Sequence, residues 1–167
     1  MIRPAAPRIG SGIDVHPFGT DPGRPLVLGG VVVPGAPGLA GHSDADVVAH
    51  ACADALLGAA ALGDLGTRFG VDRPDTAGAD SLGLLAAVVD DVRAEGLAVG
   101  NLDVTVIAQR PRLAPYRELM RERLGAVLDV PGTAVSVKFT TTDRLGTIGR
   151  GEGIAAWVCC LLLPVQR

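Results

Sequence analysis

Apolar and polar residues recur along the chain with periods that predict its helices and strands. Alternation predicts strands at residues 8–16, 102–109, 134–139 and 154–163. The last of these apolar runs is also compatible with a buried helix. Apolar residues three and four apart predict helices at about 44–62, 81–95 and 115–128. The segment PLVLGGVVVPG predicts a hairpin that turns at Gly29 and Gly30, and Gly-rich polar stretches predict loops at 63–80 and 140–153.

This order of elements predicts an α+β fold, a mixed β-sheet with helices packed on one face. Ser43 is the predicted N-cap of the first helix, because Asp46 follows three residues later as in a capping box. Ser81 is the predicted cap of the second helix. Asp46, His50 and Asp54 are spaced four residues apart, so we expect them to share one helix face.

Composition narrows the class of protein. The chain has 167 residues without a linker or repeat, so we expect one domain over 1–167, with a flexible N-terminus at 1–7. It lacks a run of about 18 apolar residues, which argues against a membrane span. A net charge of −3 and 3% aromatic residues argue against a nucleic-acid partner. Three cysteines, two of them adjacent, argue against a disulfide framework and favour a reducing cytoplasm.

Asp14, His16 and His50 form the strongest candidate site. Asp14 and His16 are two residues apart on a predicted strand, so their side chains point to the same side. A carboxylate and two imidazoles suit zinc, manganese or iron, and three protein ligands leave a coordination position open for catalysis. Spacing alone also permits a second interpretation, in which His16 ends a strand in solvent and His50 is a packed core histidine.

His42 lies just before a predicted helix N-terminus, a place that attracts anions. It could donate a hydrogen bond to a phosphate oxygen, or it could be an exposed loop residue. Asp54 could orient His50, or it could lie in solvent. Helix capping alone would account for Ser43 and Asp46.

A second polar cluster covers 140–143 and 149–153, with the sequences TTTD and GRGEG. Hydroxyls and backbone amides of small residues can hold phosphates, Asp143 could bind a hard cation, and Arg150 could bind a phosphate. An ordinary hydrophilic loop is the alternative. Asp64 would suit a hydroxyl group, and the turn at 108–116 could frame a planar base. The chain contains no P-loop, Rossmann or G-x-S-x-G motif, so phosphates would have to be held by metals and loops.

Four blocks together resemble one enzyme family, the 2-C-methyl-D-erythritol 2,4-cyclodiphosphate synthases. The blocks are RIGSGIDVHPF, LAGHSDADVVAHACADALLGAAALGDLG, NLDVTVIAQRPRL and VKFTTTDRLGTIGRGEGIA. They occur in the family's order and cover most of residues 8–156. The resemblance implies a homotrimer with active sites at subunit interfaces. It also implies a cytoplasmic phosphorus–oxygen lyase that turns 4-diphosphocytidyl-2-C-methyl-D-erythritol 2-phosphate into the cyclic diphosphate and CMP, in the non-mevalonate isoprenoid pathway.

The resemblance also implies roles for individual residues. Asp14, His16 and His50 would bind Zn²⁺, and Asp143 would bind Mg²⁺ or Mn²⁺ with the substrate diphosphate. His42 and Thr141 would act as catalytic residues that stabilise charge in the transition state. The implied substrate-binding residues are Asp14, His16, His42, Ser43, Asp64, Leu65, Gly66, Phe69, Asp72, Ala108, Gln109, Arg110, Pro111, Arg112, Leu113, Ala114, Thr140, Thr141, Thr142, Asp143 and Arg150.

The chain departs from the family pattern at three places. Residues 69–73 read FGVDR where the family has Phe-Pro-Asp-Thr-Asp, and Asp143 replaces a glutamate. Thr147 and Ile148 replace an aromatic residue and a threonine beside a cavity on the trimer axis, which in relatives can hold an isoprenoid diphosphate. Two other functions remain open. One is a metal-dependent phosphohydrolase, and the other is a non-catalytic module that binds isoprenoid phosphates or nucleotides, favoured only by the altered 69–73 segment.

Overall fold

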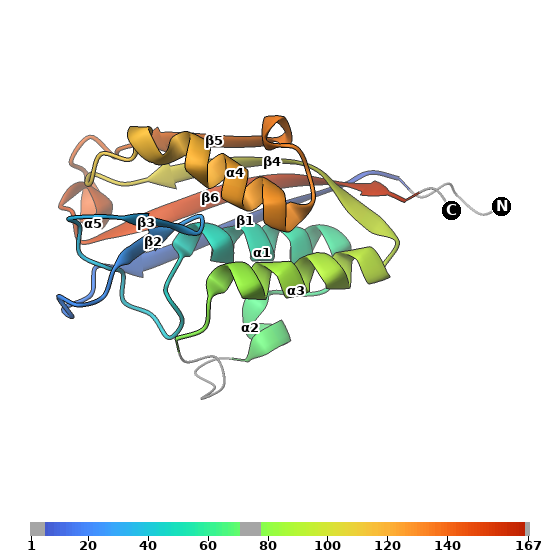
Figure 1. The fold of residues 1–167 in the computed structure, drawn as a ribbon, viewed down its shortest axis with the longest axis horizontal. Coiled ribbons are helices and arrows are strands. Elements are labelled where there is room, and N and C mark those ends of the chain that lie inside the picture. The colour runs from blue at the N-terminus through green and yellow to red at the C-terminus, as the bar shows by residue number, and fades with distance from the viewer. Residues whose placement is uncertain (1–5, 71–77, 166–167) are drawn as a thin grey trace.

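A four-stranded sheet is the centre of the molecule in the computed structural model, which describes residues 6–70 and 78–165. Its strands are β1 (Arg8–Pro17), β4 (Leu97–Ile107), β5 (Val135–Thr140) and β6 (Gly153–Pro164). They lie in the order β1-β6-β4-β5 (Figure 1). The β4–β5 pair is parallel and the other two pairs are antiparallel, so the predicted mixed sheet is confirmed. The carboxyl ends of β1, β4 and β5 therefore meet at one end of the sheet.

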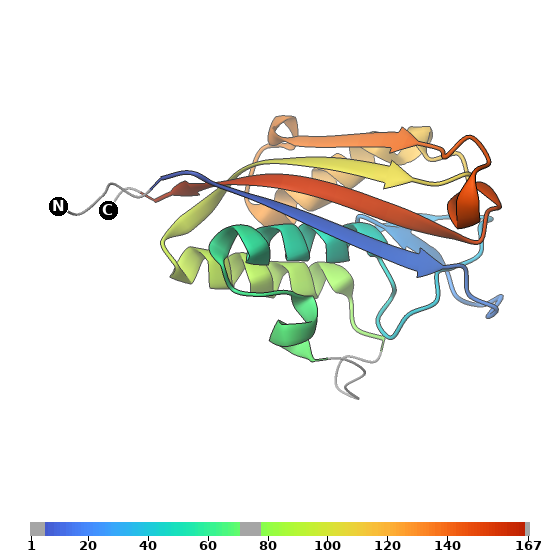
Figure 2. The ribbon, with the colours of Figure 1, turned by 180° about the vertical axis from the view of Figure 1, so that it is seen from behind.

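All three long helices cover the same face of this sheet. They are α1 (Val47–Ala60), α3 (Ser81–Ala94) and α4 (Arg117–Leu128). Figure 1 shows them in front of the sheet, and Figure 2, from behind, shows the opposite face, which none of these three helices covers. Of the 14 residues of α1, all but His50, Asp54 and Gly58 are buried, because the helix lies between the sheet and α3. The predicted α+β fold is confirmed. Among the described residues, no helix has the length and apolar character to cross a membrane.

Two glycines let α1 approach β1 closely. A Cβ atom built at Gly10 or Gly12 would lie 2.0 or 2.1 Å from a carbonyl oxygen of α1. Any larger residue would push the helix away from the strand. Because alternate side chains of a strand share a face, Asp14 and His16 point to the same helix-covered side as these glycines.

The N-cap of α1 is Asp46, so the prediction that Ser43 caps this helix is wrong. The Asp46 carboxylate is fully buried and accepts hydrogen bonds from the N–H groups of Val48 and Ala49. It also accepts those of Gly29 and Gly30, at 2.8 and 2.6 Å. These two glycines form the predicted turn between β2 (Leu26–Leu28) and β3 (Val31–Val33). Asp46 therefore fixes the hairpin to the start of α1 and does not share the face of His50.

The N-cap of α3 also differs from the prediction, here by one residue. Asp80, and not the predicted Ser81, accepts the N–H of Leu82. Both predicted loops contain a short helix, α2 (Leu65–Phe69) in the first and α5 (Gly146–Gly149) in the second. Single 3-10 turns cover Ala114–Tyr116 and Gly132–Ala134. Strand β4 begins five residues before its predicted start, since Leu97 to Val99 pair with the far end of β6 across a bulge.

Candidate metal site and substrate pockets

The structure brings Asp14, His16 and His50 together. Asp14 Oδ2 lies 2.9 Å from His16 Nε2 and 3.0 Å from His50 Nδ1, and the two nitrogens are 3.3 Å apart. A tetrahedral zinc ion with bonds of about 2.0–2.1 Å separates its ligand atoms by about 3.3 Å. The triad therefore has the donor types and the spacing to hold a divalent metal.

His16 is oriented by a backbone carbonyl. Its Nδ1 atom lies 2.7 Å from the oxygen of Ala40. Since a carbonyl only accepts hydrogen bonds, Nδ1 carries a proton, and in the neutral ring the lone pair is therefore on Nε2. That lone pair faces the other two members of the triad, as a metal ligand requires.

The charges within the triad favour cation binding. Burial alone would raise the pKa of Asp14, but hydrogen bonds and charge from His16 and His50 outweigh it and hold this pKa well below its usual range. The pKa of His16 is raised, mainly by its hydrogen bond to Asp14. The ionised carboxylate thus attracts positive charge to this point, as a proton on His16 or as a bound metal ion.

A pocket of about 350 Å³ opens beside the triad. Loop residues 41–43, including His42 and Ser43, form one part of its wall. The short helix α2 contributes Leu65, Gly66 and Phe69 to another part. Asp64 is the exposed N-cap of α2 and accepts the N–H of Thr67, and Asp72 lies outside the described residues. Segments that were predicted to bind one substrate therefore surround the candidate metal ligands.

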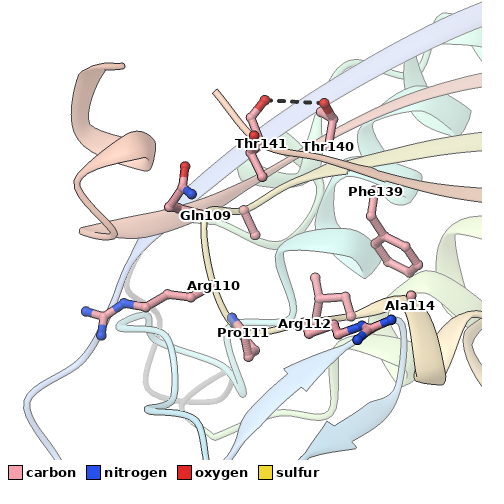
Figure 3. Close-up of a pocket in the computed structure, with 10 residues that line it drawn as sticks. Gln109, Arg110, Pro111, Arg112, Ala114, Phe139, Thr140 and Thr141 are labelled. Atoms are coloured by element: carbon pink, nitrogen blue, oxygen red, sulfur yellow. Dashed lines mark hydrogen bonds between the residues drawn. The ribbon is translucent and has the colours of Figure 1, made fainter. Parts of the chain in front are cut away.

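A second pocket, of about 340 Å³, lies where β4 and β5 end. Figure 3 shows the segments that line it, 108–114 after β4 and 139–141 at the end of β5. Phe139, Pro111 and Leu113 provide apolar surface, and the hydroxyls of Thr140 and Thr141 provide polar groups. Thr142 and Asp143 follow directly, and Asp143 lies 3.4 Å from the Thr141 hydroxyl. The pocket has apolar walls for a planar base and polar groups at its edge.

The two pockets have no lining residue in common. The triad is on β1 and α1 at one edge of the sheet, whereas Thr140 ends β5 at the other edge. Three strand spacings separate those edges, a distance of about 14 Å. A single chain thus does not bring the Thr140–Asp143 segment into the cavity beside the metal ligands. Arg150 is exposed and pairs with Glu152 at 2.5 Å.

Two site residues have positions that the sequence pattern did not predict. Asp54 does not orient His50; its carboxylate accepts the N–H of Leu65 at 2.8 Å and so anchors the start of α2. Ser81 was predicted only as a helix cap, but its hydroxyl lies 2.9 Å from His50 Nε2. Its separation of 31 residues from His50 leaves no local signal for this contact.

The fold and the site define a class, a small α+β protein with an Asp-His-His triad whose spacing suits a divalent metal. A family model described as the YgbB family matches residues 7–163. The 2-C-methyl-D-erythritol 2,4-cyclodiphosphate synthase of Moorella thermoacetica is 57% identical over 156 residues, 93% of this chain and 94% of the relative. The synthase of Symbiobacterium thermophilum is 55% identical over 154 residues, 92% and 97% of the two chains.

Solved structures agree with these relatives. IspF of Plasmodium falciparum in complex with CDP has a TM-score of 0.84 and 31% identity, covering 96% of this chain and 98% of that one. The bifunctional IspDF of Campylobacter jejuni has a TM-score of 0.92 and 40% identity, covering 96% of this chain. The chain spans only 43% of that longer protein. The chain belongs to the YgbB family, and the predicted function as a cyclodiphosphate synthase is confirmed.

Proposed function

We propose that the chain acts as a metal-dependent lyase when it converts 4-diphosphocytidyl-2-C-methyl-D-erythritol 2-phosphate to 2-C-methyl-D-erythritol 2,4-cyclodiphosphate and CMP. An oxygen of the 2-phosphate attacks the β-phosphorus. The bond from that phosphorus to the bridging oxygen breaks, and CMP leaves with the electron pair. The observation that carries the proposal is the convergence of Asp14, His16 and His50 beside a pocket large enough for a phosphorylated tetrol.

The triad would hold Zn²⁺, and Asp143 would hold Mg²⁺ or Mn²⁺ near the diphosphate. When bound, these ions supply Lewis-acid neutralisation of phosphate charge, which lets two anionic groups meet. His42 and Thr141 would donate hydrogen bonds to oxygens whose charge grows in the transition state. Because both phosphates belong to one substrate, holding its two ends brings nucleophile and electrophile together.

Each part of the substrate has a proposed set of contacts. Ser43 and α2, with its cap Asp64, would bind the methylerythritol phosphate. Segments 108–114 and 140–143 would bind the cytidine end, and Arg150 would bind a phosphate. The CDP complex of the Plasmodium falciparum relative supports a cytidine nucleotide as part of the ligand.

A homotrimer would join the two pockets into one site. The uncovered face of the sheet exposes large apolar side chains, with Ile9, Ile13 and Trp157 at 79, 62 and 52% exposure. Trp157 lies directly beside Ile13 in the β1–β6 register, so these two side chains adjoin on a face of the kind that other subunits cover. Packing three such faces together would place the β5 edge of one copy near the β1 edge of the next. The trimer axis could then bind an isoprenoid diphosphate near Thr147 and Ile148.

We further propose that the protein works in the cytoplasm. Cys52, Cys159 and Cys160 are free thiols in the structure, which suits a reducing compartment. No nucleic-acid partner is proposed, because the net charge is −3 and only 3% of the residues are aromatic.

A phosphorus NMR time course tests the proposed reaction. The purified protein is mixed with the cytidylyl substrate, Zn²⁺ and Mg²⁺, and His50→Ala serves as the inactive comparison. Release of CMP together with the coupled doublets of a cyclic diphosphate is the expected result. CMP with an open-chain phosphate would identify a hydrolase instead. Substrate binding without turnover across several metals would identify a binding module.

A further inference from the structure

We propose that Ser81 and Asp44 are positioning residues that hold His50 in the ring orientation and tautomer that a metal ligand needs. The inference rests on the proposed role of the triad as a metal site. It assigns a role to two residues that lie outside the triad and that do not line the pocket beside it.

The contacts form a chain from α1 to the loop before it. Ser81 is the first residue of α3 and is 1% exposed. Its hydroxyl lies 2.9 Å from His50 Nε2 and donates a short hydrogen bond to the Asp44 carboxylate. The second oxygen of that carboxylate accepts the backbone N–H of Ser81 at 3.2 Å. Asp44 is itself fixed, because its backbone N–H bonds the carbonyl of Ala79 at 3.1 Å.

Counting protons along this chain assigns the tautomer of His50. An ionised carboxylate has no proton to give, so the Ser81 hydroxyl donates its only proton to Asp44. The Ser81 oxygen then accepts from His50, so Nε2 carries the ring proton. The lone pair of His50 is left on Nδ1, the atom that lies 3.0 Å from Asp14 Oδ2 and 3.3 Å from His16 Nε2. Two acceptor atoms facing each other at this distance need a positive charge between them, which a proton supplies in the metal-free protein and a metal ion would supply in its place.

The Ser43 hydroxyl supports the same arrangement. It lies 3.1 Å from His50 Nε2 and 3.2 Å from the Ser81 hydroxyl. It also accepts the N–H of Ala45 at 3.2 Å, which fixes its position. His50 thus has a buried polar support on the ring side that faces away from the triad. His16 has an equivalent support in the Ala40 carbonyl, so both imidazoles are oriented from behind.

A role of Ser81 in capping α3 is the competing explanation. The structure gives that role to Asp80, whose carboxylate accepts the N–H of Leu82 at 3.1 Å. The Ser81 hydroxyl is therefore available for His50. Asp80→Ala becomes a matched control, because it removes the cap of the same helix one residue away and leaves the contacts of Ser81 in place.

The test compares Ser81→Ala, Ser81→Thr, Asp80→Ala and His50→Ala by zinc competition against a chromophoric chelator. Ser81→Ala is expected to bind zinc about 10–100-fold more weakly, the usual cost of removing an outer partner of a ligand. Ser81→Thr keeps the hydroxyl and should recover most of the affinity. Asp80→Ala should lower thermal stability without changing zinc affinity. Activity of Ser81→Ala should fall at limiting zinc and return at saturating zinc.

Nitrogen NMR of the metal-free protein provides a readout that does not involve activity. The expected spectrum shows a proton on His50 Nε2 in the wild type and a smaller population of that protonated Nε2 in Ser81→Ala. Unchanged zinc affinity in Ser81→Ala, with zinc lost in His50→Ala, would refute the positioning role and leave the metal site standing. Unchanged zinc binding in His50→Ala would instead refute the proposed metal site itself.

Discussion

Gly12 offers a sharp test of how the metal site is built. A Cβ at this position would lie 2.1 Å from the Ala51 carbonyl oxygen and 2.7 Å from the Ala55 amide nitrogen. Both are backbone atoms of α1 and cannot rotate away. Real Cβ atoms essentially never come within 3.0 Å of another heavy atom, so Gly12→Ala has to move the helix or the strand by about 0.9 Å.

The consequence is expected in both stability and metal binding. Overpacking a buried contact costs about 1–3 kcal/mol, and we expect the upper end because two backbone atoms clash. Gly12 is two residues before Asp14, and α1 carries His50, so the same displacement separates the ligands across the β1–α1 interface. A loss of zinc affinity of at least about tenfold follows, similar to the removal of an outer partner of a ligand.

Urea unfolding of the protein after its metal has been removed with a chelator measures stability. Zinc competition against a chromophoric chelator measures zinc affinity separately. Gly58→Ala is the matched control, since Gly58 is on the same helix, is exposed and has no atom within 4 Å of an added Cβ. It should stabilise the protein by about 0.5–1 kcal/mol and leave zinc affinity unchanged. The reasoning is refuted if Gly12→Ala matches the wild type in both measurements.

Three further predictions concern carboxylates. Asp46→Ala leaves four N–H groups without their acceptor, three of them buried and that of Gly30 half-buried, and should cost at least about 3 kcal/mol in urea unfolding at pH 7. Burial raises the pKa of Asp54 in the folded protein. The contribution of this group to stability is therefore fully present at a pH below the pKa of the unfolded state, and it is lost as the pH rises through the pKa of the folded state. Asp54→Asn keeps an acceptor for Leu65 and should raise the Tm of the chelated protein at pH 7, an advantage that vanishes below about pH 4. Asp143→Ala should weaken the magnesium dependence of activity while zinc content, measured on the purified protein, stays unchanged.

The prediction of the triad had two sources. Local patterns placed each ligand on a regular element, and the family resemblance favoured a metal site over an exposed His16 and a packed core His50. Strand alternation places Asp14 and His16 on one side, and helix periodicity places His50 within an apolar segment. The hairpin at Gly29 and Gly30 could also be predicted from the sequence. A pair of glycines indicates a turn with positive φ, and both residues have positive φ in the structure. Sequence patterns are sufficient to predict features, such as a turn or the face of a strand, that are set by neighbouring residues.

Contacts between distant segments could not be predicted in this way. Ser43 satisfies a local capping rule, yet Asp46 caps α1 because Gly29 and Gly30 bring two more N–H groups to its carboxylate. The contact of Ser81 with His50 and that of Asp54 with Leu65 likewise join segments whose approach depends on packing. Short helices such as α2 are missed for a related reason, since they contain too few residues to show a period.

Because the two pockets lie at opposite edges of the sheet, assembly should affect ligand binding and turnover separately, although these two properties are usually lost together. All three proposed zinc ligands come from one chain, so zinc binding should not require assembly. The segments proposed for the cytidine end are also complete within one chain, so a monomer should bind the nucleotide. Only the reaction needs both pockets around the same substrate. A subunit kept monomeric by charged substitutions at Ile13 and Trp157 would then bind zinc and CDP separately, with no turnover. Turnover by such a monomer would mean that one chain can close the distance of about 14 Å by itself.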